Sequence, residues 1–267
     1  MMPIPVALTM AGSDSSGGAG IQADLKTFAA LGVYGASVIT ALTAQNTTGV
    51  SAIHQVPADF ITAQIDAVFG DLDVAAVKIG MVAQVATLEA IVAGLMRWSP
   101  KHVVLDPVMV ATSGDRLLAA DAIAALRTKL IPRALLITPN LPEAAALLDE
   151  PVASSEAAIE AQGQRLLSLG CPAVLIKGGH GHGAESIDYL VRASGTIALP
   201  APRVATKNTH GTGCSLSSAI AAGLAKGEDL ETAVRGAKAW VSAAIAAADR
   251  LGVGHGHGPI HHFHRFY

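Results

Sequence analysis

The chain is poor in charge, in aromatic residues and in cysteine. Charged residues make up 15% of its 267 residues, and the formal net charge is −3. This weak charge gives no general attraction to nucleic acid or to an anionic membrane, so neither is expected as a partner. The two cysteines, Cys171 and Cys214, have no paired spacing. That argues against a disulfide framework and a cysteine-based zinc site, and it fits a reducing, cytoplasmic location.

Signals for export and for membrane insertion are also missing. The first residues lack the basic segment of a signal peptide. No apolar run reaches the length of a membrane span, although the mean hydropathy is +0.45. Hydrophobic residues make up 51% of the chain but aromatic residues only 4%, which suits close packing of helices on a sheet. With no linker, charge run or change of composition, residues 1–267 are expected to form a single domain.

Strand-like and helix-like segments alternate along the chain. Strands are predicted over residues 6–10, 36–43, 50–56, 75–79, 102–105, 135–138 and 173–176, with a hairpin over 186–191 and 196–199. Helices are predicted over residues 22–31, 57–68, 85–96, 121–130, 143–148, 156–169 and 230–251. This alternation predicts an α/β fold with a mostly parallel sheet covered on both faces.

Polar or glycine residues follow strand after strand. They are Asp14, Gln45, Lys78 to Met81, Asp106, Asn140 to Glu143, and Lys177. The carboxyl ends of strands in an open α/β sheet are where ligands bind. We therefore expect these residues to line one rim of one sheet.

A glycine-containing loop at residues 208–214 (NTHGTGC) runs directly into small and apolar residues that suit a packed helix. Gly211 and Gly213 would let the free N–H groups of the first helical turn approach a phosphate closely. Cys214 would stand where a polar group faces the atom that attacks or receives a phosphoryl group. The pattern alone also fits a turn capped by Thr212 or Ser215, and it matches neither of the common phosphate-loop signatures.

Two carboxylates and a lysine could complete such a site. Asp106 and Glu143 follow strands, and Mg²⁺ that accompanies nucleotide phosphates takes one or two carboxylates with several waters. Lys177 could neutralise charge on a transferring phosphoryl group. Singly, these residues also fit a turn before Pro107, a first-turn helix carboxylate and a solvated loop lysine.

Other polar and apolar residues could hold a flat heterocycle. A glutamine amide such as Gln45 can donate to and accept from a ring, and Asp24 could accept a hydrogen bond from a hydroxyl or amino group. Asp24 also fits an exposed helix carboxylate with Lys26 and Lys78 as possible neighbours, and Gln45 a capped strand end. Met81, Val108 and Met109 could form an apolar slot, or they could be ordinary core.

Two further segments allow more than one interpretation. The histidine-rich end of the chain, residues 252–264, could suggest a metal site, but its loose glycine-rich spacing favours a structural tail that folds back. Residues 111–116 (ATSGDR) could form a flap over the site.

Seven segments in order resemble one enzyme family. They are residues 11–24 (AGSDSSGGAGIQAD), 40–47 (TALTAQNT), 77–81 (VKIGM), 105–109 (LDPVM), 138–143 (TPNLPE), 175–180 (LIKGGH) and 208–214 (NTHGTGC). They resemble the hydroxymethylpyrimidine/phosphomethylpyrimidine kinases of thiamine biosynthesis, in the ribokinase-like superfamily. The resemblance covers nearly the whole chain. Ser215, where threonine is expected, departs from it, but either hydroxyl can cap a helix.

The resemblance implies a three-layer α/β/α sandwich that uses ATP and Mg²⁺. It implies phosphorylation of 4-amino-5-hydroxymethyl-2-methylpyrimidine to its monophosphate and then to its diphosphate, by a homodimer. Substrate contacts are implied for Gly12, Asp24, Gln45, Met81 and Val108. Metal binding is implied for Asp106 and Glu143. ATP or phosphate contacts are implied for Asn140, Lys177, Thr209, Gly211, Thr212 and Gly213, with Cys214, Lys177, Gly211 and Gly213 as the catalytic set.

Cys214 takes the position where sugar kinases of the superfamily carry an aspartate base. A thiol at a helix N-terminus has a lowered pKa, so a thiolate base is possible, whereas a nearby triphosphate would raise that pKa again. We therefore expect Cys214 to orient or deprotonate the substrate hydroxyl.

Other functions on similar folds stay open at this point. A pyridoxal/pyridoxine kinase would share the phosphate site and differ in the ring pocket. A catalytically silent pyrimidine-binding protein would keep the pocket without turnover. A Rossmann oxidoreductase is disfavoured because the first loop lacks G-x-G-x-x-G in the correct place.

Overall fold

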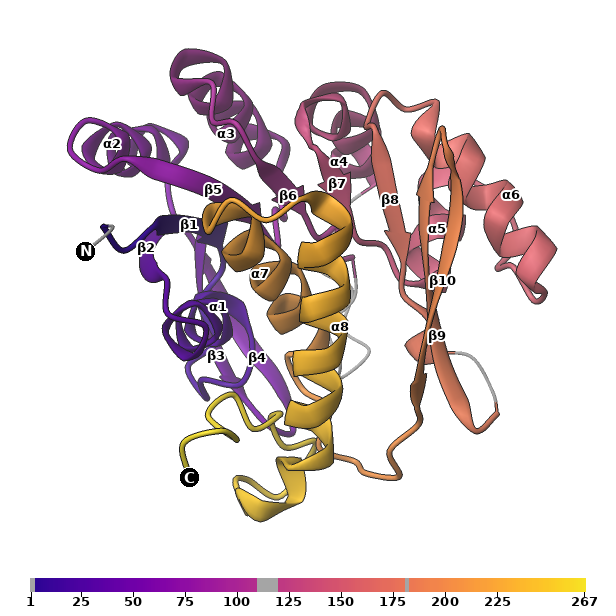
Figure 1. Cartoon of the computed structure of the whole chain (residues 1–267). Coiled ribbons are helices and arrows are strands. Elements are labelled where there is room, and N and C mark those ends of the chain that lie inside the picture. The colour runs from indigo at the N-terminus through magenta and orange to yellow at the C-terminus, as the bar shows by residue number, and fades with distance from the viewer. Residues whose placement is uncertain (1–2, 110–119, 181–182) are drawn as a thin grey trace.

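A mostly parallel sheet forms the centre of the molecule. The computed structural model describes residues 3–109, 120–180 and 183–267. Within them, eight strands lie in the order β10-β9-β8-β7-β6-β5-β1-β2 (Figure 1). The strands from β8 to β2 are parallel, and β9 and β10 add an antiparallel edge. Their bounds are β1 Val6–Ala11, β2 Tyr34–Ile39, β5 Val74–Ile79, β6 Val103–Leu105, β7 Leu136–Ile137, β8 Ala173–Ile176, β9 Glu185–Arg192 and β10 Gly195–Pro202.

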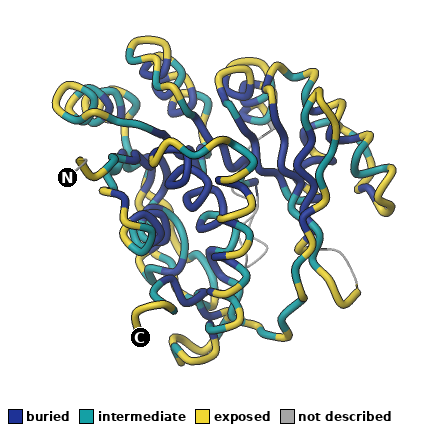
Figure 2. Tube along the Cα trace, viewed as in Figure 1, coloured by how far each residue is buried: buried dark blue, intermediate teal, exposed yellow. Residues whose placement is uncertain are grey.

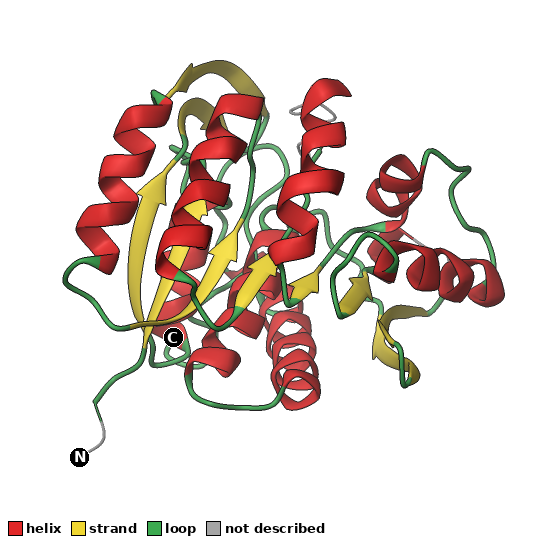
Figure 3. Ribbon diagram, turned by 90° about the horizontal axis from the view of Figure 1, so that it is seen from above, coloured by secondary structure: helices red, strands yellow, loops and turns green. Residues whose placement is uncertain are grey.

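Helices cover both faces of this sheet, as the view from above shows (Figure 3). One face packs against α2 (Ala58–Phe69), α3 (Val85–Trp98), α4 (Ala120–Ala125), α5 (Leu141–Leu148) and α6 (Glu156–Leu167). The other packs against α1 (Gly20–Ala30), α7 (Thr212–Ala225) and α8 (Leu230–Ala246). Short helical segments, one π-helical and three 3₁₀, lie at Leu126–Leu130, Ile131–Arg133, Gly178–His180 and Ala248–Arg250. The predicted three-layer α/β/α architecture is confirmed.

The strands divide their side chains between two hydrophobic cores. In β1, Leu8 and Met10 face one core while Ala7 faces the other. This period of two is what a strand buried on both faces must show, because successive side chains point to opposite sides. Figure 2 shows the buried residues concentrated along these strands and α7.

Helix α7 is buried almost all round, which explains its small residues. It packs against α1, α8 and the sheet. A Cβ on Gly223 would lie 2.9 Å from the Cβ of Ala233 in α8, so larger residues could not fit between these helices. A helix without a polar face is what a position between two layers requires.

The predicted strand over residues 36–43 is wrong in one respect: it spans two strands of different sheets. The chain leaves the central sheet at Thr40, whose N–H still donates to the carbonyl oxygen of Ala11 at 3.0 Å. It continues as β3 (Ala41–Asn46), which pairs with β4 (Gly49–Gln55) in a separate two-stranded antiparallel sheet. A run of β-forming residues does not reveal such a change of partner, because both sheets accept the same side-chain pattern.

The histidine-rich C-terminal end folds back on the domain, as the sequence favoured. The N–H of His257 donates to the carbonyl oxygen of Thr47 at 2.9 Å, and the N–H of His261 donates to that of Ala244 at 3.1 Å. Across residues 3–109, 120–180 and 183–267, no cluster of three or more histidine, cysteine or acidic residues could hold a metal. Nor does any helix in these ranges have the length and apolarity to cross a membrane.

A buried ion pair ties four elements together behind the carboxyl ends of the strands. Lys78 of β5 donates to both carboxylate oxygens of Asp24 in α1, at 2.9 and 2.8 Å, and neither side chain is exposed. Asp24 also accepts from Thr9 of β1 at 2.6 Å and from Ser218 of α7 at 2.7 Å. Burial alone would lower the pKa of Lys78, but the adjacent Asp24 raises it above its ordinary value, so this lysine stays charged.

We expect Asp24→Ala to lower the free energy of unfolding by about 3–5 kcal/mol, because it leaves a charged lysine buried without its partner. Urea denaturation measures this. The matched control is Glu89→Ala, which breaks the exposed pair with Lys129 and should cost under about 1 kcal/mol. Equal, small losses in both variants would show that the buried pair does not hold these elements together.

Candidate active site

A cavity of about 830 Å³ opens at the carboxyl ends of the parallel strands. The polar residues that follow successive strands border it, as predicted from their positions in the sequence: Asp14, Gln45, Lys78, Asp106, Asn140, Glu143 and Lys177. Gln45 differs in origin, because it reaches the cavity from the separate β3–β4 hairpin rather than from the rim of the central sheet. The cavity is therefore enclosed by two sheets.

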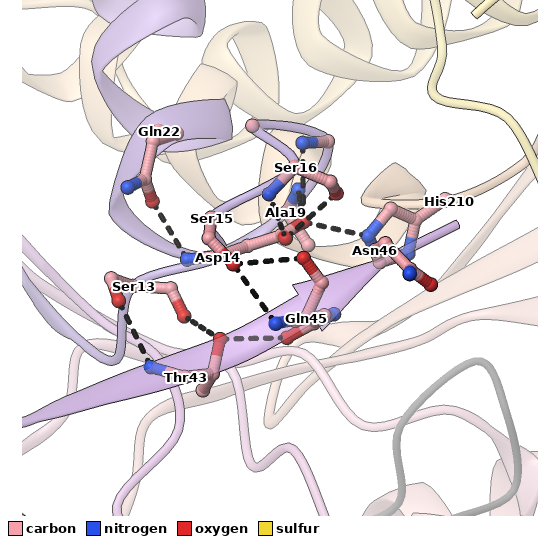
Figure 4. Close-up of polar contacts among 12 residues, drawn as sticks. Ser13, Asp14, Ser15, Ser16, Ala19, Gln22, Thr43, Gln45, Asn46 and His210 are labelled. Carbon is pink, nitrogen blue, oxygen red and sulfur yellow. Dashed lines mark hydrogen bonds and ion pairs between the residues drawn. The ribbon is translucent and has the colours of Figure 1, made fainter. Parts of the chain in front are cut away.

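The loop between β1 and α1 is organised by Asp14. One carboxylate oxygen accepts hydrogen bonds from the N–H and hydroxyl of Ser16 at 2.9 and 2.7 Å, and the other from the N–H groups of Gly18 and Ala19 at 3.1 and 2.8 Å. The second oxygen also lies 2.7 Å from Nε2 of His210 (Figure 4). Burial opposes the charge, but the hydrogen bonds from His210 and Ser16 hold the pKa of Asp14 well below its usual range.

This loop is also fastened to β3. The hydroxyl of Thr43 donates to the carbonyl oxygen of Ser13 at 2.8 Å. The hydroxyl of Ser15 donates to the carbonyl oxygen of Gln45 at 2.8 Å, and the N–H of Gln45 donates back to that hydroxyl at 2.9 Å. These contacts fix the backbone at Gln45 and leave its partly buried side chain beside the cavity (Figure 4).

The N-terminus of α7 lies against the same loop. Gly211 is the N-cap, with φ of 78°, and a Cβ there would overlap the carbonyl oxygen of Gly18. Glycine is needed because the two backbones touch and the conformation is left-handed. The hydroxyl of Thr212 donates to the carbonyl oxygen of Thr209 at 2.7 Å, which holds the loop before the helix. The prediction that a helix begins at this glycine loop is thus confirmed, and the beginning of the helix lies at the cavity.

Lys177 is the centre of charge in the cavity. Its Nζ lies 2.7 Å from Oδ1 of Asp106 and 3.7 Å from Oε2 of Glu143. Burial disfavours its charge, but the two carboxylates raise its pKa above the usual value. Burial raises the pKa of Glu143, and Lys177 opposes that change. Glu143 also closes a capping box with Asn140 at the start of α5, so its position is fixed by the helix.

One carboxylate oxygen of Asp106 has no hydrogen-bond partner among the described residues. Its Oδ2 is buried and accepts no hydrogen bond from the part of the chain that the structure describes. A Cβ on Gly213 would lie 3.6 Å from this oxygen and 3.2 Å from Nζ of Lys177, so the first turn of α7 stands directly beside them. Two carboxylates suit Mg²⁺, which prefers oxygen ligands and keeps several waters, while the neighbouring backbone N–H donors suit a phosphate.

Cys214 is partly buried at the cavity, in the first turn of α7. Burial raises the pKa of its thiol to about 11, and the opposing effect of the Lys78 charge does not offset it. The thiol is therefore neutral near pH 7. Of the two roles expected for Cys214, a neutral thiol favours orienting the substrate hydroxyl over deprotonating it.

Of the residues expected to contact a pyrimidine, all except Asp24 border the cavity. Gly12, Gln45, Met81 and Val108 border the cavity, and a Cβ on Gly12 would lie 2.6 Å from Cε of Met81. Asp24 is fully buried with both oxygens engaged by Lys78 and is not among the residues that border the cavity, so its expected contact with substrate stays a prediction. Sequence position could not show this, because the pair joins residues 54 positions apart.

The residues expected to contact ATP or phosphate all border the cavity: Asn140, Lys177, Thr209, Gly211, Thr212 and Gly213. Sequence reasoning missed His210 as the partner of Asp14, and it missed Asp188 and Lys238, which pair at 2.8 Å beside the cavity. An aspartate inside the apolar strand β9 was the available signal for the second pair. The expected flap at residues 111–116 lies outside the described residues.

Comparisons with known proteins agree with the geometry. The chain is 59% identical over 262 residues to a hydroxymethylpyrimidine/phosphomethylpyrimidine kinase of Rhizobium meliloti, covering 98% of both chains. A solved phosphomethylpyrimidine kinase of Clostridium difficile is 45% identical with a TM-score of 0.81, over 91% of this chain and 100% of that one. The pyridoxal kinase of Staphylococcus aureus in complex with ADP is 30% identical with a TM-score of 0.91, over 99% and 96%.

The family model described as phosphomethylpyrimidine kinase matches residues 14–261, which span both glycine loops and the carboxylate–lysine cluster. With the match to nearly the whole length of the Rhizobium enzyme, this shows that the chain belongs to the phosphomethylpyrimidine kinase family.

Proposed function

We propose that this protein transfers the γ-phosphoryl group of ATP to 4-amino-5-hydroxymethyl-2-methylpyrimidine, and then a second phosphoryl group to the monophosphate, in thiamine biosynthesis. One observation carries the proposal. A single cavity holds a glutamine and apolar residues in one part, and the Lys177–Asp106 pair beside the N-terminus of α7 in another. Family membership supports the same reaction.

The pyrimidine would lie against the β3–β4 hairpin. Gln45 can donate to and accept from the aminopyrimidine edge, while Met81 and Val108 supply apolar surface for the ring. Gly12 leaves room for Met81, because any side chain there would displace it. The hydroxymethyl group would then point towards Cys214 and Gly213.

The phosphates of ATP would occupy the charged part of the cavity. Backbone N–H groups from Gly211 to Gly213 would bind the transferring group, and Lys177 would stabilise its charge. Asn140, Thr209 and Thr212 supply further polar groups there. Asp106 and Glu143 would hold a Mg²⁺ ion, which would neutralise negative charge on the phosphates.

Phosphoryl transfer needs mainly position and charge stabilisation from this site. The substrate oxygen forms a bond to the γ-phosphorus while the bond to the departing ADP oxygen breaks, and the hydroxyl proton passes to water. Lys177 has its own carboxylate partners at hand, so it stays charged and correctly placed before substrates arrive. The neutral thiol of Cys214 orients the hydroxyl by hydrogen bonding rather than removing its proton.

The proposed location is the cytoplasm, and the proposed assembly is a homodimer. Cys171 and Cys214 are both free thiols, which suits a reducing compartment. We also take residues 1–267 as one folding unit, because the central sheet contains both the first strand of the chain, β1, and the last, β10.

The proposed first experiment measures ADP release with MgATP and, separately, the hydroxymethylpyrimidine, its monophosphate and pyridoxine. We expect turnover of both pyrimidines and much slower turnover of pyridoxine. Gln45→Ala should raise KM for the pyrimidine by about tenfold or more, because a lost ring contact is worth about 1–3 kcal/mol. Its KM for ATP should change little. Fastest turnover of pyridoxine would indicate a vitamin B6 kinase, and no turnover by folded protein would indicate a binding protein.

Cys214→Ser should retain kcat within about tenfold of the wild type, and kcat should depend on pH in the same way for both between about pH 6 and pH 9. The reason is that the thiol, with its pKa raised to about 11, is neutral across this range. A rise of kcat with pH that appears in the wild type and disappears in Cys214→Ser would instead identify a thiolate base.

The homodimer proposal rests on exposed apolar side chains near the edge strand β2. Tyr34 of β2, Leu42 of β3 and Phe60 of α2 are 59%, 47% and 60% exposed. A contiguous apolar patch marks a contact surface, and these residues would supply one if they lie together in the dimer interface. Sedimentation equilibrium should return twice the mass of the chain, and Leu42→Lys with Phe60→Lys should shift it towards the monomer. A monomeric wild type at micromolar concentration would contradict the proposal.

A further inference from the structure

The C-terminal segment, defined as residues 252–262, contacts both walls of the cavity without supplying a group to the proposed reaction. It follows α8 and runs back towards the β3–β4 hairpin (Figure 1). Within it, glycine alternates with histidine at residues 254–258 (GHGHG). The segment bends at residues 255–257, and Gly254 has a left-handed backbone with φ of 77°.

On one side, this segment is bonded to the hairpin. The N–H of His257 donates to the carbonyl oxygen of Thr47 at 2.9 Å, and the N–H of Gly256 donates to the Thr47 hydroxyl at 3.2 Å. A Cβ on Gly256 would overlap that carbonyl oxygen, and a Cβ on Gly254 would overlap the Thr47 side chain. Thr47 follows β3 directly, two positions after Gln45. The glycines therefore let the segment lie in direct contact with the backbone that carries Gln45.

On the other side, it is bonded to the loop that precedes α7. The N–H of His210 donates to the carbonyl oxygen of Gly258 at 3.0 Å, and the N–H of Gly258 donates to the Asn208 side chain at 3.1 Å. A Cβ on Gly258 would overlap the same Asn208 oxygen. Further along, the ring of His262 lies 2.9 Å from the hydroxyl of Ser215 in α7.

The hairpin needs such an attachment. A two-stranded sheet is marginally stable by itself, and β3–β4 is not part of the central sheet. Its contacts with residues 13–15 hold the side that faces the first glycine loop. The C-terminal segment holds the turn at Thr47, which those contacts do not reach.

We propose that the C-terminal segment is a positioning element that sets the distance between the hairpin bearing Gln45 and the anion-binding loop before α7. Glycine is required at residues 254, 256 and 258 because a Cβ at each would overlap Thr47 of the hairpin or the Asn208 side chain of the loop. The inference rests on the proposed function, in which these two walls hold the two substrates. It gives the histidine-rich end of the chain a part in substrate alignment and none in metal binding.

The test is Gly256→Ala in the full chain. Gly256 has no left-handed backbone, so alanine acts only by pushing against Thr47. The control is Gly49→Ala on the same hairpin, where a Cβ meets open space. We expect Gly256→Ala to raise KM for the pyrimidine about tenfold or more, since misplacement by about 1 Å can cost 10²-fold. KM for ATP should stay within about twofold in both variants, and Gly49→Ala should resemble the wild type.

A second, milder variant guards against misfolding. Thr47→Val keeps the side-chain shape and removes the hydroxyl that accepts from Gly256. It should shift KM for the pyrimidine in the same direction by a smaller factor. An unchanged KM for the pyrimidine in both variants, or equal increases in both KM values, would overturn the proposal.

Amide hydrogen exchange separates this proposal from the proposed function. Gly256→Ala should speed exchange in the β3–β4 hairpin and leave β6 and β7 as in the wild type, whatever the substrate is. Unchanged exchange in the hairpin would overturn the positioning role even if the pyrimidine is turned over. Faster hairpin exchange in Gly256→Ala, together with no turnover of the pyrimidine by the wild type, would support the positioning role of the C-terminal segment and reject the kinase assignment.

Discussion

The buried pair between Asp24 and Lys78 is the interaction on which the arrangement of the site depends. It brings β1, α1, β5 and α7 to one point, directly behind the residues that border the cavity. Replacing such a pair with apolar residues is often neutral for stability, but losing one member is costly. Its value here is positional. Because Lys78 forms its ion pair with Asp24 rather than with a substrate, it keeps a positive charge next to Cys214 and Asp106.

A second contact, between the Asp14 carboxylate and the His210 ring, joins the two glycine loops. Each loop needs glycine where the two meet, because a Cβ on Gly211 would overlap the carbonyl oxygen of Gly18 and a Cβ on Gly18 would overlap the ring of His210. The loops come from opposite ends of the chain. Side-chain and backbone contacts therefore assemble one binding surface from two distant segments, and the C-terminal segment adds the hairpin to the same assembly.

The cluster of Lys177, Asp106 and Glu143 is balanced before any ligand binds. Burial disfavours the charge of Lys177, but the carboxylates of Asp106 and Glu143 raise its pKa; burial likewise raises the pKa of Glu143, and Lys177 opposes that change. A site of this kind is ordered in advance, which lowers the reorganisation that phosphoryl transfer requires.

The sequence by itself determined the α/β layers, the rim of polar residues and the glycine loop at the start of α7, because periodicity and composition act locally along the chain. The motifs also indicated the family. Only the tertiary structure decided that β3 leaves the central sheet, that Asp24 pairs with Lys78, and that the thiol of Cys214 is neutral. Each of these depends on burial or on a partner distant in sequence. Burial and distant partners arise when the layers pack, so no local pattern records them.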